Sequence, residues 1–92
     1  MFLLVCYDVP SERCVLYHDL LNRYLLWKQN SVFMGDLTVS TYKKLRAEIK
    51  AMQDKADRVM FLECANRHNI NLVVCENMIE KNDTNHKASM IL

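Results

Sequence analysis

The order of hydrophobic patterns along this chain predicts an α+β protein, a ferredoxin-like sandwich in which two helices cover one face of an antiparallel sheet. Three observations support the prediction. Residues 2–7 form an unbroken apolar run, two later segments carry apolar residues at helical spacing, and two β-rich runs follow. Glycine and proline occur once each and 51% of the residues are hydrophobic, which is typical of a domain rich in regular structure.

The length of 92 residues fits one domain. A chain of this size buries roughly two-thirds of the surface that its unfolded form exposes, so its core is thin and dimerisation would stabilise it. We expect a ferredoxin-like domain at residues 1–76 and a mostly polar C-terminal tail at residues 77–92. The tail is expected to be mobile, or to dock on a partner through its apolar end, Met90-Ile91-Leu92.

The first half of the chain predicts a strand, a helix and a bent or paired strand. Residues 2–7 are expected to be a buried central strand that ends in a turn. Leucines and tyrosines at helical spacing predict an amphipathic helix over residues 11–26, with Ser11 as its N-cap. Residues 27–37 mix aromatic, β-branched and polar residues, which predicts a bent strand or a tight hairpin, with Gly35 permitting the bend.

The second half predicts one helix and two strands. Thr38 or Ser40 is expected to cap the helix. Its apolar positions recur every three or four residues, at Tyr42, Leu45, Ile49, Met52 and Ala56. Residues 59–64 and 70–76 are expected to be strands separated by a polar turn at residues 66–69. The last strand is extra to the ferredoxin-like pattern, and an apolar edge strand favours pairing with another chain, which predicts a homodimer.

Charge and cysteine usage argue against several classes of protein. Twelve basic and eleven acidic residues give a net charge of +1, so contact with nucleic acid requires a local patch. None of the four cysteines has C-x-x-C spacing, which argues against a zinc ribbon or a redox pair. We expect free thiols in a reducing, cytoplasmic compartment. The apolar N-terminal run is too short for a signal peptide or a membrane span, so no membrane partner is expected.

Two segments of the chain resemble the CRISPR-associated protein two family. The opening strand ends in Tyr7-Asp8-Val9. After one helix, residues 29–38 read Gln-Asn-Ser-Val-Phe-Met-Gly-Asp-Leu-Thr, an aromatic-centred Ser-Val-Phe followed by a small residue and a helix cap. The resemblance covers residues 1–76. Each motif alone is weak, but both in this order and in a chain of this length are fairly specific.

The resemblance implies a ferredoxin-like homodimer that binds Mg²⁺ (or Mn²⁺) between the two first-strand aspartates. Asp8 matches that aspartate, and Phe33 matches the aromatic residue of Ser-Val-Phe. The family implies an endonuclease of RNA or DNA, and a dimer that holds DNA with the CRISPR-associated integrase during acquisition of spacers from foreign DNA. The family's basic run after the aspartate is thin here, with Arg13 there and Arg23 further along the helix, so weak or conditional activity is expected.

Asp8 is the candidate catalytic and metal-binding residue. A carboxylate at the end of a buried strand is a hard oxygen ligand suited to Mg²⁺, and two copies related by a dimer axis can share one ion. The alternative is that Asp8 only caps the turn before the helix. Glu12 and Asp36 are the nearest further carboxylates by motif position, and both are expected to be solvated.

Arg13, Arg23 and Phe33 are the candidate nucleic-acid-binding residues. The two arginines could donate to phosphates, and the phenylalanine could stack on a base. The alternatives are ordinary surface charge for the arginines and core packing for Phe33. The basic face of the second helix is most simply a solvated face, with some chance of touching a DNA backbone.

Three functions remain open at this stage. The first is a metal-dependent endonuclease with paired Asp8 side chains, and the second is a non-catalytic dimeric DNA-binding adaptor of the integration complex. The third is a toxin-type ribonuclease of the same fold, as in the virulence-associated protein D group. The substitution Asp8→Asn separates the first two, and an integrase gene and a repeat array nearby would favour the CRISPR functions over the third.

Overall fold

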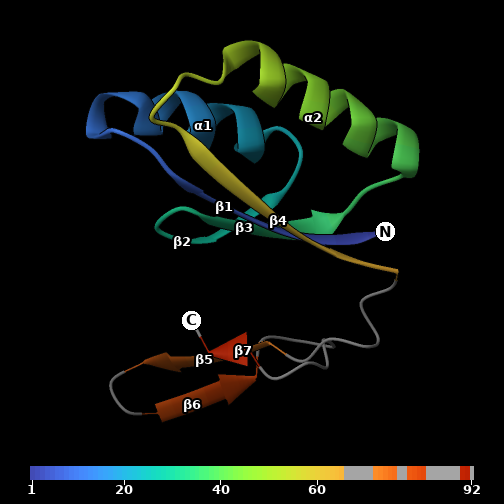
Figure 1. Ribbon diagram of the computed structural model, residues 1–92. Coiled ribbons are helices and arrows are strands. Elements are labelled where there is room, and N and C mark those ends of the chain that lie inside the picture. The colour runs from blue at the N-terminus through green and yellow to red at the C-terminus, as the bar shows by residue number, and fades with distance from the viewer. Residues whose placement is uncertain (66–71, 77–78, 83–89, 92) are drawn as a thin grey trace.

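The computed structural model describes residues 1–65, 72–76, 79–82 and 90–91. Its first part is a four-stranded antiparallel sheet with two α-helices on one face, which confirms the predicted ferredoxin-like fold class (Figure 1). The strand order is β2-β3-β1-β4. The elements of this part are β1 (Phe2–Asp8), a 3-10 helix (Ser11–Arg13), α1 (Cys14–Asn22), β2 (Leu26–Gln29), β3 (Val32–Asp36), α2 (Val39–Met52) and β4 (Arg58–Cys64).

β1 is a central strand of this sheet. It pairs with β3 on one side and with β4 on the other, so its sequence is a continuous apolar run and not an alternation of apolar and polar residues. Leu3 and Val5 belong to the main core beneath the helices. Phe2 and Leu4 form a smaller buried cluster with Met34 on the opposite face of the sheet. β1 therefore anchors both faces and carries Asp8 to the end of the sheet.

The first helical segment is shorter than predicted, and its start differs. The chain enters a 3-10 turn at Ser11–Arg13 and becomes α-helical at Cys14. The side chain of Ser11 makes no capping hydrogen bond, so its predicted role as the N-cap is wrong. Leu25, which fits the helical spacing, lies beyond α1 but is buried in the same core. Its amide donates to the carbonyl of Leu21 at 2.8 Å, so the chain closes the helix there and still packs a leucine inward.

β2 and β3 form a hairpin, one of the two predicted possibilities. The turn is at Asn30, which has a positive φ of 43° that asparagine tolerates better than most residues. Trp27 donates from Nε1 to the Asn30 carbonyl at 2.9 Å. The prediction that Gly35 permits a bend is wrong, because Gly35 pairs in register with Leu3 and has no positive φ. A Cβ at Gly35 would lie 3.1 Å from Leu25 Cδ2, so glycine serves close packing.

α2 begins where the sequence predicted and ends earlier. Thr38 is its N-cap, because Thr38 Oγ1 accepts a hydrogen bond from the Thr41 amide at 3.1 Å. The buried positions of the helix are Tyr42, Leu45 and Ile49. The helix ends at Met52, where the next residue turns to an extended conformation. Ala56, predicted as its last apolar position, is exposed in the loop before β4.

The predicted strand at residues 70–76 is present as β5 (Leu72–Glu76), and it lies in a second sheet. β5 pairs antiparallel with β6 (Ile79–Asn82) and parallel with β7 (Met90–Ile91). The sequence predicts no strand after residue 76, because these two short segments lie among polar residues. The predicted polar turn, and most of the predicted mobile or docking tail, fall outside the described residues, which omit residues 66–71, 77–78, 83–89 and 92.

No helix in the part of the chain that the structure describes is both long and apolar enough to span a membrane.

Candidate metal and nucleic-acid site

Asp8 ends the central strand and faces solvent. It is the last residue of β1, it lies opposite Arg58 of β4, and it is exposed although most of β1 is buried. Within residues 1–65, no hydrogen bond or ion pair engages its carboxylate. The alternative role as a turn cap therefore has no hydrogen bond to support it. A carboxylate without an internal partner is open to an external cation.

A surface hollow of about 460 Å³ lies beside Asp8 at the ends of β1 and β4. Its other described lining residues are Cys6, Tyr7, Ser31, Arg58, Val59 and Met60. Among them Arg58 is the only charged side chain besides Asp8. The register of β1 and β4 thus places one carboxylate and one guanidinium at the same end of the sheet.

The donor chemistry of Asp8 fits Mg²⁺, and the described residues supply one such carboxylate at this place. Mg²⁺ takes oxygen ligands, usually one or two carboxylates together with waters and phosphate oxygens. The described residues contain no group of three or more His, Cys, Asp or Glu side chains that could hold a metal. Asp36 pairs with Phe2 at the other end of β1, roughly 20 Å from Asp8 along the strand. Within residues 1–65, Asp8 is the one carboxylate that lines the hollow.

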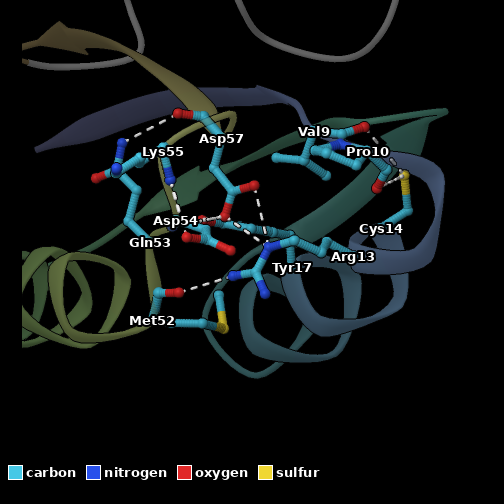
Figure 2. Close-up of polar contacts among 10 residues, drawn as sticks. All are labelled: Val9, Pro10, Arg13, Cys14, Tyr17, Met52, Gln53, Asp54, Lys55 and Asp57. Carbon is cyan, nitrogen blue, oxygen red and sulfur yellow. Dashed lines mark hydrogen bonds and ion pairs between the residues drawn. The ribbon is translucent and has the colours of Figure 1, made fainter.

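Arg13 donates its hydrogen bonds within the fold (Figure 2). Its Nε lies 3.0 Å and 2.9 Å from the two carboxylate oxygens of Asp57, and its Nη2 donates to the Met52 carbonyl at 2.7 Å. These bonds tie the start of the first helical segment to the end of α2. Motif position predicted a phosphate contact for Arg13, which stays a prediction, and did not predict this structural role.

Asp57 is the residue that sequence reasoning missed. Among residues 1–65 it alone combines a charge with burial, at 4% exposure. Tyr17 donates from its hydroxyl to Asp57 Oδ2 at 2.8 Å, and the Asp54 amide donates to the same oxygen at 3.0 Å. Burial alone raises the pKa of the Asp57 carboxyl, but hydrogen bonds from Asp54, Tyr17 and Arg13 outweigh it and hold that pKa below its ordinary value. The only sign of Asp57 in the sequence is its place, as an acidic residue just ahead of the strand predicted at residues 59–64.

The same cluster keeps the hydroxyl of Tyr17 protonated. Burial and the neighbouring Asp57 raise the pKa of Tyr17 to about 12. A phenol is protonated at neutral pH even at its ordinary pKa, and the raised pKa keeps Tyr17 a hydrogen-bond donor to a higher pH. Asp57, Arg13 and Tyr17 form a structural unit behind the turn that follows Asp8 (Figure 2).

Phe33 is a core residue. Its side chain is fully buried, and its ring lies 6.4 Å from the ring of Tyr7 and 5.3 Å from that of His18. A buried ring has no face open to a base, so the structure contradicts the predicted stacking role and confirms core packing. Trp27, which is 53% exposed, is the aromatic side chain of this hairpin that faces solvent.

Arg23 is exposed, but its surroundings are mixed in charge. It borders a hollow of about 470 Å³ that is also lined by Asp19 and Glu48. Two carboxylates beside a guanidinium weaken the local attraction for a phosphate. A phosphate contact by Arg23 stays a prediction.

The family model described as CRISPR associated protein Cas2 matches residues 1–70 of this sequence. The chain belongs to the Cas2 family. It is 38% identical over 69 residues to the CRISPR-associated endoribonuclease Cas2 3 of Thermodesulfovibrio yellowstonii. The aligned region covers 74% of this chain and 78% of that protein. It is 34% identical over 68 residues to the CRISPR-associated endoribonuclease Cas2 of Methanosarcina acetivorans, covering 73% and 78%.

Solved Cas2 structures share the fold of this chain. A structure described as the crystal structure of cas2 matches with a TM-score of 0.64 and 34% identity, over 73% of this chain and 87% of that one. Streptococcus pyogenes Cas2 at pH 6.5 also matches with a TM-score of 0.64, at 28% identity, over 71% and 87%. The family recognised from the two sequence motifs is thereby confirmed. The family model ends before β5.

Proposed function

We propose that this Cas2 family protein is a metal-dependent endonuclease that cleaves RNA or DNA as a homodimer. The observation that carries the proposal is the exposed carboxylate of Asp8 at the end of the central strand, which has no hydrogen-bond or ion-pair partner within residues 1–65. Relatives that share 34–38% of their aligned residues with the chain are named endoribonucleases. The type of nucleic acid is left to experiment.

Asp8 would hold Mg²⁺ or Mn²⁺, and two chains would supply two such carboxylates. A divalent cation bound there polarises a phosphoryl oxygen or lowers the pKa of a bound water. Arg58 lies opposite Asp8 in the sheet and adds positive charge beside the position of the phosphate. The described lining of the hollow offers no histidine or second acid as a general base, so weak or conditional activity is expected.

We further propose that the dimer works with the CRISPR-associated integrase in spacer acquisition, on the support of its family. A non-catalytic DNA-binding adaptor is the second candidate. It is favoured by the single carboxylate in the hollow and by the engagement of Arg13 within the fold. Membership of the Cas2 family favours both of these over the toxin-type ribonuclease.

A nuclease assay with Asp8→Asn tests the enzymatic proposal. Single-stranded RNA, single-stranded DNA and duplex DNA are each incubated with Mg²⁺, Mn²⁺ or a chelator. We expect the wild type to cleave at least one substrate only with metal, and Asp8→Asn to be about a hundredfold slower or more, because the charge-stabilising ion loses its ligand. Asp19→Asn, which removes an exposed acid from α1, is the control and is expected to match the wild type.

Two outcomes count against the enzyme. Cleavage by Asp8→Asn at the wild-type rate would show that Asp8 is not the metal ligand of the reaction. A wild type that cleaves no substrate across a range of pH and both metals, while still binding DNA, would favour the adaptor.

A further inference from the structure

α2 presents a stripe of three cations toward the edge strand β4. Lys43, Arg46 and Lys50 are spaced three and four residues apart and border a groove of about 420 Å³, here called the α2 groove. The rest of its described lining is Ala47, Ile49, Gln53, Val59 and Phe61. No carboxylate belongs to that lining. Glu48, the one acid of α2, instead borders the hollow against α1 and accepts a hydrogen bond from the Tyr24 hydroxyl.

The charges of the stripe are not neutralised within the part of the chain that the structure describes. Lys43, Arg46 and Lys50 form no ion pair there, in contrast to Arg13. The Arg46 guanidinium lies over the ring of Tyr42, with Cζ 5.5 Å from the centroid, which holds it against the helix. The groove therefore combines fixed positive charge with an apolar floor.

We propose that the α2 groove binds the phosphate backbone of nucleic acid. A row of cations that forms no ion pair among the described residues attracts a polyanion more strongly than an isolated surface lysine does. The acid of β4 on this side, Glu63, accepts a hydrogen bond from the Tyr42 hydroxyl and does not line the groove. The stripe extends roughly 10 Å along the helix axis, a length over which one nucleic-acid strand carries about three phosphates. Contacts of this kind position a strand without selecting its sequence, and both RNA and DNA provide the same phosphodiester chemistry.

The α2 groove adjoins the hollow beside Asp8. Val59 lines both of them, and its neighbour Arg58 lines the hollow next to Asp8. Asp8 alternates along β1 with the helix-side core residues Leu3, Val5 and Tyr7, so its side chain lies on the sheet face away from the helices, and a strand held in the groove would cross the β4 edge to reach it. The passage of a nucleic-acid strand from the groove to Asp8 depends on the proposed function at Asp8. The affinity of the groove for phosphate does not depend on it.

Two charge-matched double variants test the groove. Lys43→Gln with Lys50→Gln removes two cations of the stripe, and Lys44→Gln with Lys55→Gln removes two exposed lysines that do not line it. Binding is followed by fluorescence anisotropy with labelled single-stranded RNA and labelled duplex DNA of mixed sequence. A chelator is present and the salt concentration is varied.

We expect the groove variant to lose roughly tenfold in affinity at low salt. The slope of log affinity against log salt should become shallower by about 1.4 for the single strand, because two phosphate contacts are lost. The control variant is expected to stay within about twofold of the wild type at about 0.15 M salt, where attraction beyond roughly 8 Å is screened. Both variants should melt like the wild type, because these lysines are exposed. The affinity of the groove variant is compared with that of the wild type for each nucleic acid. The nucleic acid whose affinity falls more is the preferred ligand of the groove.

Equal losses in the groove and control variants would overturn the proposal. So would a wild type that binds neither probe at about 100 µM protein in low salt, the weak end of non-specific binding. Asp8→Asn in the same assay is expected to retain binding. If Asp8→Asn cleaves like the wild type in the nuclease assay while the groove variant fails to bind here, the proposal for Asp8 fails and the proposal for the α2 groove is supported.

Discussion

At the residue scale, Asp8 and Asp57 are two aspartates with opposite surroundings. Asp8 is exposed and has no partner among residues 1–65, whereas Asp57 is buried and bound by Arg13 and Tyr17. The sequence predicted Asp8, because it ends an apolar strand within a family motif. It did not predict Asp57, because the partners of this residue lie 40 and 44 positions away and only the fold brings them together.

Asp57→Asn is expected to lower the melting temperature most at neutral pH, because a neutral amide cannot balance the Arg13 guanidinium. The pKa of Asp57 in the folded protein lies below its ordinary value of 3.8, so the folded state favours the carboxylate. This contribution is complete above the ordinary value and is lost as the pH falls through the lower folded value. Thermal melts followed by circular dichroism from about pH 3 to pH 8 measure it.

In those melts the difference between wild type and Asp57→Asn should shrink below about pH 4. Asp54→Asn, which changes an exposed acid of the same loop, is the control and should show a smaller difference at neutral pH. An Asp57→Asn difference that is independent of pH would mean that the charge of Asp57 does not stabilise the fold.

At the scale of elements, the sequence predicted which helices and strands exist better than where they end. The spacing of apolar residues identified α2, and the unbroken apolar run identified β1. The end of α1 was misplaced because Leu25 continues the helical spacing while packing from a loop. The role of Gly35 was misread because close packing against Leu25 leaves no mark in the local sequence.

Thr38→Ala is expected to destabilise the protein by about 1 kcal/mol, because the Thr41 amide loses its capping acceptor. Urea unfolding should show a lower midpoint with an unchanged slope. Ser40→Ala is the matched control at the other predicted cap, and we expect a smaller loss there, since the Ser40 hydroxyl lies 3.3 Å from Thr38 Oγ1 on the exposed surface and caps no amide. Equal losses in both variants would contradict the assignment of Thr38 as the N-cap.

At the scale of the whole molecule, the sheet order brings the proposed functions to neighbouring surfaces. β4 begins where β1 ends, so Asp8 and Arg58 share one hollow, and the α2 groove borders β4 on the face that the helices cover. The Tyr7-Asp8-Val9 motif predicted an acid at the end of β1. The spacing of lysines and arginines predicted a basic face on the second helix. The groove itself was not predictable, because it exists only where that face meets β4.

The central claim is that two Asp8 carboxylates, one from each of two chains, bind one divalent cation. Titration with Mn²⁺, followed by electron paramagnetic resonance and combined with light scattering in the same buffer, tests it most directly. We expect a dimer that binds one ion per two chains, with this binding lost in Asp8→Asn and retained in Asp19→Asn. A monomer that binds one ion per chain, or an Asp8→Asn variant that binds Mn²⁺ as tightly as the wild type, would contradict it.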